Sequence, residues 1–485
     1  MALILALVIA LACHAQAKAV FAHFMLANSQ NFTLDDWKED ITLAQAAKID
    51  AFALNTGYGG PYTGQLLNDA FAVAAELDFK LFLSLDYSGD GRWPQDQVIK
   101  WLGNYTKLPA YYKHNGEKPL VSTFEGYEAQ GDWTNIKKKV DCFFMPDWSS
   151  ILPEQLASSN VTDGLMSWSA WPDGTAPMNT SMDERYQSAL RSTGGTDKPY
   201  IMPVSPWFYT NMVRYNKNWV WQGDDLWYKR WDQVVDIEPE YVEILTWNDF
   251  GESHYIGPIH EHDLGTFTSG GAPYDYAIGM PHDGWRAFLP YVIDRYKTGA
   301  GSATVDQEGL VTWYRLTPSW ACSDGKTTGN TATQAQHTYP PGEVLKDEIF
   351  FSALLDSAAN LTVSIGDEEA EIIAWSDMPA GGNGAPGLYF GSVPMDNRIG
   401  EVNVTLTRDG QALAQVLGQP ISTQCGSNNL TNWNAWVGSN MTDPSANGSN
   451  SKDSGAAAWS SRSPLQQPAV LISGLIVWLG LWLVI

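Results

Sequence analysis

The chain has 485 residues and a formal net charge of −25 at pH 7. This length allows two or three domains with full hydrophobic cores. The negative charge argues against nucleic acid as a partner, because phosphate binding requires a basic surface. Tryptophan (22) and tyrosine (21) are abundant. We expect core packing to use most of them and the rest to be free to stack on sugar rings.

Residues 1–17 are predicted to be a signal peptide. The stretch Met1 to Ala17 is apolar and ends in Ala15-Gln16-Ala17, a small-x-small pattern typical of signal-peptidase sites. It lacks a basic start, and its apolar run is short for a membrane span. We expect the mature protein to begin near Lys18.

Residues 18–298 alternate strand-like and helix-like segments, which predicts a TIM (β/α)8 barrel of the usual size. A doubly wound open sheet is the alternative, but no glycine-rich phosphate loop follows the first strand. The helical stretches include Leu34–Ala47, Gly64–Leu77, Gln95–Tyr105 and Asp224–Val235. The predicted strands are Ala19–Met25, Ala51–Asn55, Leu81–Leu85, Leu120–Phe124, Cys142–Pro146, Gly164–Ser169, Tyr200–Val204 and Val242–Trp247.

Carboxylates and aromatic side chains recur just after these strands, at the end of a barrel where active sites lie. Acids there can transfer protons, and aromatic faces can stack on sugars, so the pattern predicts a carbohydrate hydrolase. For Asp86 the alternative is a cap of the following loop. The residues are His23, Tyr58, Asp86, Glu125, Trp148, Trp168, Trp171, Trp207, Asn248, Asp249 and Glu252.

The last strand ends in the densest of these clusters. Asp249 and Glu252 are three residues apart, so in an unbroken strand they would point to opposite faces. Gly251 lies between them and would let the chain turn, which brings both carboxylates to one cavity. The alternative is a solvated acidic turn or a cap of the next element.

A zinc hydrolase is a further alternative, because His254, His260 and His262 lie close together in the sequence. His260-Glu261-His262 lacks the helical i, i+4 spacing of metal-binding pairs, and no companion motif is evident. We therefore expect neither a metal nor another cofactor.

Residues 299–425 are predicted to form a β-sandwich domain, and residues 426–454 a flexible stalk rich in Ser, Asn and Gly. Short alternating segments separated by Gly, Pro, Asp and Asn predict the strands. They are Leu310–Leu316, Ile349–Leu354, Leu361–Ile365, Ala370–Trp375 and Glu401–Leu406.

Removal of the signal peptide removes Cys13 and leaves three cysteines, so at most one disulfide forms within the chain. Cys142 lies in an apolar run and is expected to be a buried thiol. Cys322 and Cys425 are then the expected disulfide.

Residues 455–485 are predicted to be a GPI-anchor signal that is removed on maturation. Small residues, Ser454-Gly455-Ala456, precede a polar spacer and an uncharged apolar tail from Ala469 to Ile485. A tail-anchored transmembrane helix is the alternative, but no Lys or Arg follows the tail. We expect a monomeric cell-surface or cell-wall glycoprotein, attached to the membrane only by its anchor. Its nine N-glycosylation sequons begin at Asn31, Asn104, Asn160, Asn179, Asn360, Asn403, Asn429, Asn440 and Asn447.

The chain resembles the fungal α-1,3-glucanases, or mutanases, of glycoside hydrolase family 71. Four motifs carry the resemblance: Ala22-His23-Phe24-Met25, Phe52-Ala53-Leu54-Asn55, Phe82-Leu83-Ser84-Leu85-Asp86 and Thr246-Trp247-Asn248-Asp249-Phe250-Gly251-Glu252-Ser253. The resemblance covers most of residues 18–425, and the last motif is the most specific.

The resemblance implies a TIM-barrel catalytic domain with an accessory β domain, acting on α-1,3-glucan of the fungal cell wall. It also implies an inverting mechanism that uses Asp249 and Glu252, with Asp86 as a third carboxylate. We predict Glu252 as the acid and Asp249 as the base. Asp86 would raise the pKa of a neighbouring acid or orient the water. Tyr58, Trp148, Trp168, Trp171 and Trp207 are candidate sugar platforms.

Two other functions are compatible with the sequence. One is a glucan-binding wall protein without turnover, although the presence of all three acids argues against it. The other is a glucan transglycosidase, which an inverting mechanism without a covalent intermediate makes less natural.

Overall fold

Eight parallel strands form the barrel that the sequence predicts. The computed structural model describes residues 18–191, 197–299, 301–331, 336–426 and 428–442. Neighbouring barrel strands pair in chain order, and the last pairs with the first. A bridge between Asp147 and Met166 joins the short fifth and sixth strands and completes the ring. The strands are β1 (Ala19–Met25), β2 (Ala51–Gly57), β3 (Lys80–Asp86), β5 (Lys118–Phe124), β6 (Phe143–Phe144), β7 (Leu165–Met166), β8 (Tyr200–Val204) and β11 (Tyr241–Ile244).

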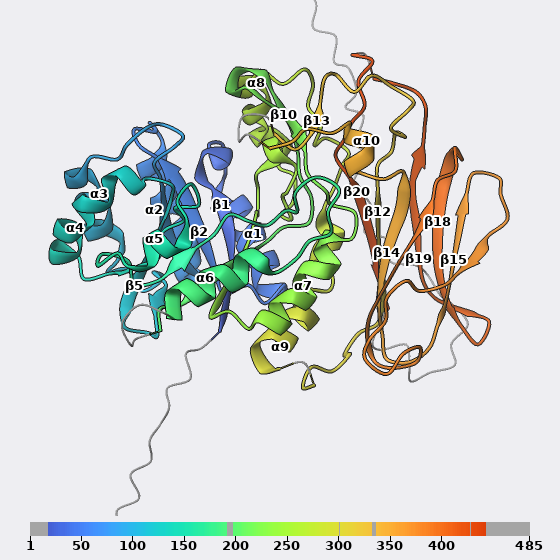
Figure 1. Cartoon of the computed structure of the whole chain (residues 1–485), viewed down its shortest axis with the longest axis horizontal. Coiled ribbons are helices and arrows are strands. Elements are labelled where there is room, and N and C mark those ends of the chain that lie inside the picture. The colour runs from blue at the N-terminus through green and yellow to red at the C-terminus, as the bar shows by residue number, and fades with distance from the viewer. Residues whose placement is uncertain (1–17, 192–196, 300, 332–335, 427, 443–485) are drawn as a thin grey trace, which may run out of the picture. The chain divides into compact units, whose positions relative to one another are not determined.

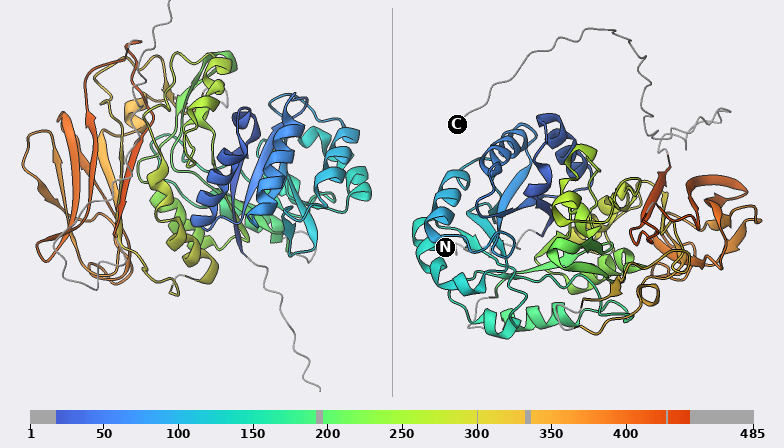
Figure 2. Two further views of the ribbon diagram at one scale, coloured as in Figure 1. Left: turned by 180° about the vertical axis from the view of Figure 1, so that it is seen from behind. Right: turned by 90° about the horizontal axis from the view of Figure 1, so that it is seen from above.

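A helix follows each barrel strand and lies outside the ring, as the view from above shows (Figure 2). The strands are buried almost throughout, because helices cover their outer face and side chains fill the inside. Figure 1 shows the alternation from blue to yellow. The helices are α1 (Leu34–Ala46), α2 (Thr63–Glu76), α3 (Gln95–Tyr105), α4 (Trp133–Lys139), α5 (Pro153–Ala157), α6 (Ser181–Arg191), α7 (Leu226–Ile237) and α9 (Leu289–Thr298), with a short α8 (Gly265–Gly270) inserted after β11.

Helix α1 begins where Thr33 can cap it. The Thr33 hydroxyl accepts a hydrogen bond from the Asp36 N–H (3.3 Å), and the Asp36 carboxylate accepts one from the Thr33 N–H (2.6 Å). This reciprocal pair satisfies donors that a helix start leaves unpaired. It also holds the Asp36 carboxylate in a fixed position at the start of the helix.

Two four-stranded antiparallel sheets form the accessory β region. Alternate side chains from both sheets, among them Phe351, Leu361 and Val404, share one hydrophobic core, which is the packing of a β-sandwich. The first sheet has the order β17 (Gly387–Pro394), β14 (Glu348–Leu355), β12 (Gly309–Tyr314), β20 (Trp436–Met441). The second has the order β16 (Glu371–Ile373), β15 (Asn360–Ile365), β18 (Gly400–Arg408), β19 (Gln411–Ile421).

The prediction of a stalk from Gly426 onward is wrong for residues 428–442. Strand β20 pairs with β12 along its whole length. Trp433 and Asn434, which precede it, are buried. The composition of this segment did not predict a strand, because Ser439 and Asn440 occupy its exposed end while Trp436 packs inward.

A small third sheet connects the β region to the barrel. After β8 the chain forms a hairpin of β9 (Tyr209–Met212) and β10 (Lys217–Val220). Strand β10 pairs on its other side with β13 (Thr328–Gly329), which comes from the segment after β12. The hairpin is therefore held from both parts of the chain.

The cysteines behave as the sequence predicts. Cys322 and Cys425 form a disulfide with a Cα–Cα distance of 5.8 Å. It lies in the segment between β12 and β13 and fixes that segment to the chain that precedes β20. Cys142 is a buried free thiol, and burial raises its pKa to about 12, so it is inert as a nucleophile.

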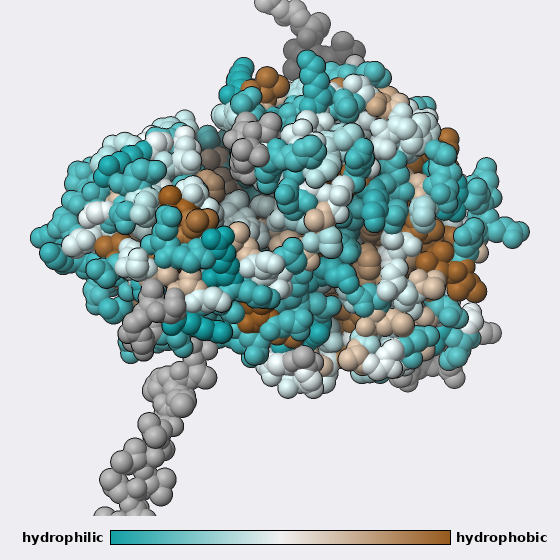
Figure 3. Space-filling view, in the orientation of Figure 1, coloured by the Kyte–Doolittle hydropathy of each residue, from teal (hydrophilic) through white to brown (hydrophobic). Residues whose placement is uncertain are grey.

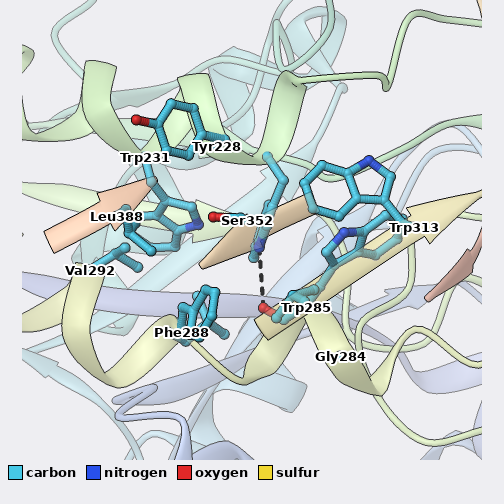
Figure 4. A pocket seen from close by; sticks show the side chains of 12 residues that line it. Tyr228, Trp231, Gly284, Trp285, Phe288, Val292, Trp313, Ser352 and Leu388 are labelled. Atoms are coloured by element: carbon cyan, nitrogen blue, oxygen red, sulfur yellow. Dashed lines mark hydrogen bonds between the residues drawn. The ribbon is translucent and has the colours of Figure 1, made fainter. Parts of the chain in front are cut away.

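Tryptophans fill the junction between the barrel and the β region (Figure 4). Trp227 of α7, Trp285 of the barrel and Trp313 of β12 surround a cavity of only about 30 Å³. The Trp227 indole donates to the Trp285 carbonyl (3.1 Å), and the Trp313 indole donates to the Asp224 carbonyl (2.8 Å). The barrel and the β region are thus joined by packed aromatic side chains as well as by the connecting chain.

The predicted signal peptide (1–17), the anchor signal (455–485) and the end of the predicted stalk lie outside the described residues. Within these residues, no helix has the length and apolar character needed to cross a membrane. The face seen in Figure 3 is largely hydrophilic. Of the eight described sequon asparagines, seven are exposed and Asn403 is half-buried. This is compatible with export, which stays a prediction.

Candidate active site

A cavity of about 890 Å³ opens at the carboxyl ends of the barrel strands, within the size range of ligand sites. The ends of β1, β2, β3 and β5, the loop after β11, the hairpin β9–β10 and helix α8 supply its walls. Five residues predicted from the sequence line it, namely His23, Asp86, Trp168, Asp249 and Glu252. The cavity therefore brings together side chains from distant barrel strands.

The loop after β11 folds back on itself and carries two of these acids. The chain leaves the strand through a cis peptide bond between Leu245 and Thr246. The Thr246 N–H donates to the His254 carbonyl (2.8 Å), and the Ile256 N–H donates to the Thr246 carbonyl (3.0 Å). Both ends of the loop are thus fixed, so the acids lie on a short, anchored span.

The turn between the acids differs from the prediction. Asp249 caps a short 3-10 helix, Phe250–Glu252, by accepting the Glu252 N–H (3.2 Å). The left-handed residue is Ser253, with a φ of 58°, and not Gly251. At Gly251 a Cβ would lie 3.0 Å from side-chain atoms of both Met212 and Thr266, so these side chains would have to move slightly to admit a larger residue.

His254 joins the two acids. Its side chain is fully buried, with Nε2 3.1 Å from Glu252 Oε2 and 3.6 Å from Asp249 Oδ2. Burial lowers the pKa of His254, but hydrogen bonds and charge from the two carboxylates outweigh it and raise the pKa to about 9. His254 is therefore protonated at neutral pH, between two anions. The ring of Phe208 stacks on it at 5.5 Å.

Lys217 of β10 forms an ion pair with the other carboxylate oxygen of Glu252. Burial alone would raise the pKa of Glu252, but Lys217 and His254 together lower it to about 2. Glu252 is thus ionised at neutral pH in the free site. The pKa of Lys217 is raised, first by Glu252 and then by Asp249 and Asp86, against the effect of burial. Among the described residues that line the cavity, Lys217 is the only lysine or arginine.

Asp86 ends strand β3, three strands from β11 around the ring. Its Oδ1 accepts hydrogen bonds from the Ser88 N–H (2.7 Å) and the Gly89 N–H (2.9 Å). It therefore caps the following turn and also lines the cavity. These backbone bonds fix the carboxylate in place.

His23 and Trp168 form another part of the wall. Nδ1 of His23 is 2.7 Å from Glu243 Oε1, and both side chains are buried. Within the described residues Nε2 of His23 has no hydrogen-bond partner, and this atom is buried like the rest of the side chain. Trp168 packs edge-on against His23 and Phe124, with ring centroids 5.1 and 4.8 Å away.

The hairpin side of the cavity carries aromatic residues that the sequence did not single out. Phe208, Trp219 and Trp221 pack together with ring centroids 4.3–5.7 Å apart. Tyr62 and Tyr215 also line the cavity and are 57% and 51% exposed. Flat apolar faces beside carboxylates and an amphipathic rim suit a sugar chain.

Two predicted platforms belong to the core instead. Trp148 and Trp207 are 0% and 1% exposed, so neither can stack on a sugar. Trp148 packs against Phe144, and the Trp207 indole donates to the Trp433 carbonyl (3.0 Å). A strand-end position predicts the right end of the barrel, but it does not predict whether a large ring turns into the cavity or back into the helical layer.

Asn248 also has a structural role in place of the predicted substrate contact. It is buried, and its amide accepts from the Met25 N–H (2.7 Å) and donates to the Met25 carbonyl (3.1 Å). Its own carbonyl accepts from the Asn28 side chain (2.9 Å). These bonds fix the loop after β11 to the end of β1.

Tyr58, Trp171 and Glu125 lie near the site but outside the lining of the cavity. Trp171 stacks on Trp221 at 5.0 Å and supports the aromatic wall from behind. Glu125 accepts hydrogen bonds from the Ser150 N–H (3.0 Å) and hydroxyl (2.6 Å). Direct substrate contact by these three residues stays a prediction.

Two groups of described side chains have a spacing that could hold a metal ion. One is Asp249, Glu252 and His254, where the Lys217 ammonium already supplies a positive charge to Glu252. The other is Asp36, His260 and His262, outside the lining of the cavity.

The site brings together groups that can move protons. The carboxylates of Asp86, Asp249 and Glu252 and the Lys217 ammonium line the cavity, and the protonated imidazole of His254 is buried beside two of these acids. This is the equipment of general acid–base catalysis on a bound ligand. Sequence reasoning missed the roles of Lys217 and His254. The alternation of polar and aromatic residues from Lys217 to Trp221 is a strand signal, but it does not say that this strand faces Glu252.

Comparison with known proteins shows which family and which relatives the chain is similar to. The profile of glycosyl hydrolase family 71 matches residues 16–450. A mutanase from Penicillium rubens is 34% identical over 438 residues, which cover 88% of this chain and 90% of that protein. A glucan endo-1,3-α-glucosidase from Schizosaccharomyces pombe is 34% identical over 440 residues, 87% of this chain and 94% of that protein.

A similar solved structure is that of a family 99 endo-α-mannosidase from Bacteroides thetaiotaomicron. It superposes with a TM-score of 0.45 and 14% identity, over 58% of this chain and 98% of that one.

Proposed function

Because the chain belongs to glycosyl hydrolase family 71, we propose that it hydrolyses α-1,3-glucosidic linkages in fungal cell-wall α-1,3-glucan. The observation that carries this proposal is the meeting of Asp86, Asp249 and Glu252 in one cavity. Hydrolysis of a glycosidic bond requires a proton for the leaving oxygen and an activated water. An acidic cavity also favours a neutral polysaccharide over an anionic ligand.

Asp86, Asp249 and Glu252 have different proposed roles in this reaction. The sequence predicts Glu252 as acid and Asp249 as base in an inverting reaction, whose two carboxyl groups stand about 6.5–9.5 Å apart around a water. In the free site an oxygen of Asp249 lies within 4.8 Å of one of Glu252. Asp86 approaches from a strand further round the ring, so we assign the positioning of the attacking water to it.

Other wall residues supply binding contacts. Glu243 on Nδ1 fixes the orientation of the His23 ring, and the buried Nε2 has no partner among the described residues, so a shift of the wall on binding would let it hydrogen-bond a sugar hydroxyl. Trp168 and Trp219 offer aromatic faces on two sides of the cavity. We propose that these residues hold the sugar units next to the cleaved linkage.

A Lys217→Met variant separates the acid and base roles of Glu252. Without the ammonium, burial raises the pKa of Glu252 from about 2. If Glu252 must be ionised, as a base is, the acidic limb of the kcat/KM profile moves to higher pH and activity at low pH falls. If Glu252 must be protonated, as its sequence-based assignment as the acid predicts, the alkaline limb of the profile moves to higher pH instead. Because Glu252 is ionised in the free site, we expect the acidic limb to move.

The profile of kcat/KM against pH is the right measurement, because it reports groups of the free enzyme. Lys100→Met, at an exposed lysine of α3, is the matched control and should leave the profile unchanged. A Lys217→Met profile identical to that of the wild type would show that Lys217 does not act on Glu252 during turnover.

The proposed activity is tested by incubating the wild-type protein with α-1,3-glucan and measuring new reducing ends. We expect release from this glucan and none from α-1,4-glucan or β-1,3-glucan. Two results would contradict the proposal. Glucan that is bound without new reducing ends would indicate a wall-binding protein, and glucan joined into longer chains would indicate a transglycosidase.

A further inference from the structure

A second group of titratable residues lies at the start of α1, outside the cavity lining. Oδ1 of Asp36 is 3.5 Å from Nδ1 of His260, and Oδ2 of Asp36 is 3.4 Å from Nε2 of His262. One ligand atom from each of the three residues lies within 4.8 Å of the others. The sequence argument against a metal was that the two histidines lack the helical i, i+4 spacing and that no companion motif is evident. The fold supplies Asp36 from the other end of the barrel sequence.

The spacing of these atoms suits one tetrahedral cation. Bonds of 2.0–2.1 Å at tetrahedral angles place neighbouring ligand atoms about 3.3 Å apart. The separation of 3.5 Å between Asp36 Oδ1 and His260 Nδ1 is close to this value, and His262 Nε2 is 3.4 Å from the other oxygen of the same carboxylate. Two imidazole nitrogens with one carboxylate oxygen favour a dication such as Zn²⁺ over Ca²⁺ or Mg²⁺, which prefer oxygen ligands only.

His260 is oriented as a metal ligand would be. Its Nε2 is 2.8 Å from Oδ1 of the buried Asp40, whose Oδ2 accepts the Trp247 indole N–H (2.9 Å). Such a carboxylate on the far nitrogen fixes the tautomer and directs the other nitrogen to a metal. Nδ1 of His260 is the nitrogen left over, and it is the one that faces Asp36.

Charge also distinguishes this group from the acids of the cavity. In the described part of the chain, the only ion-pair partners of Asp36 are the two histidines. Glu252, in contrast, already pairs with the Lys217 ammonium, which competes with a metal ion. His262 is half exposed, so an ion has a path from solvent.

We propose that Asp36, His260 and His262 bind a Zn²⁺-type dication, with Asp40 orienting His260. The ion joins the start of α1 to the loop after β11. Next to it, Asp263 accepts the Asn31 N–H at 3.0–3.1 Å, and both residues line the cavity. The role of the ion is therefore to stabilise one wall of the cavity. This inference does not depend on which polysaccharide the cavity binds.

Binding is tested on the full mature protein after treatment with a chelator, by calorimetric titration with Zn²⁺ and by the visible absorption of added Co²⁺. We expect one equivalent of either ion to bind and to raise the melting temperature. His262→Ala removes an exposed ligand without opening the core, and it should weaken Zn²⁺ binding more than about 10-fold. It should also abolish the tetrahedral Co²⁺ absorption.

Two control variants make the result specific. His337→Ala removes another exposed histidine far along the chain and should bind as the wild type does. Glu252→Gln should also retain binding. Loss of binding in Glu252→Gln but not in His262→Ala would place the ion in the cavity and overturn the proposal. Absence of stoichiometric Zn²⁺ binding by the wild type would overturn it as well.

Discussion

Glu252→Gln is expected to lower kcat on α-1,3-glucan by about 10²–10⁴-fold, the usual contribution of a general acid or base. The amide keeps the size of the side chain but can neither accept nor deliver a proton. Asp249→Asn should have an effect in the same range, because both carboxylates share His254 as a partner. Measurement of kcat and KM separately should show the loss mainly in kcat, since a proton-transfer group acts in the transition state.

Asp86→Asn is an informative companion in this series. An amide oxygen can still accept the hydrogen bonds from the Ser88 and Gly89 N–H groups, so the turn that Asp86 caps should survive. Loss of activity in this variant would then report the missing negative charge. It would support a role for Asp86 in positioning the water.

Asp90→Asn is the matched control, because Asp90 is an exposed carboxylate that lines the same cavity but lies outside the acid cluster. We expect it to retain activity within about 10-fold, as a group with no part in proton transfer should. If Asp90→Asn lost as much activity as Glu252→Gln, general charge in the cavity would explain the effect. Equal melting temperatures of the variants would exclude unfolding.

The barrel was predictable because its strands carry a strong local signal. Ala19–Met25 and Tyr200–Val204 have the predicted bounds, since both faces of each strand are buried and the apolar run has no interruption. Strand β20 was missed for the opposite reason. Its exposed residues, such as Ser439 and Asn440, look like those of a linker, and only pairing with β12 makes it a strand.

The acids were predictable because their place in the fold follows from their place in the sequence. Asp86 and Asp249 each come just after a strand, and strands of a parallel barrel end on one face. For Lys217, no such rule relates its position in the sequence to its position in the site. It lies on an inserted hairpin, and its distance from Glu252 depends on how that hairpin packs against the β region. The fate of Trp148 and Trp168, one buried and one on the wall, depends likewise on side-chain packing.

A protein that ends at Thr298 is expected to be inactive and insoluble, although it contains every barrel strand. Removal of the β region would expose Trp207, Trp227 and Trp285, which now pack in the junction. Exposing one such side chain costs about 1.5–3 kcal/mol. Three of them together would use up much of the roughly 5–15 kcal/mol by which a native domain is stable.

The active site itself would also lose support. Strand β10 carries Lys217, and it is held by pairing with β13 and by the Asn218 side chain, which donates to the Gly325 carbonyl (3.0 Å). Both partners come from the segment after β12, which the Cys322–Cys425 disulfide fixes. Without that segment, even a refolded barrel would lack the contacts that fix strand β10. Glu252 would then lose its ion pair with the Lys217 ammonium.

A protein that ends at Thr442 is the control, because it keeps β20, the disulfide and both sheets. We expect its activity on α-1,3-glucan to equal that of the full mature chain. Soluble expression, melting temperature and release of reducing ends would be compared for the two truncations. An active protein ending at Thr298 would show that the barrel is an independent catalytic domain. If soluble protein ending at Thr298 can be recovered, its inactivity would show instead that the β region completes the catalytic cavity by holding the hairpin that carries Lys217.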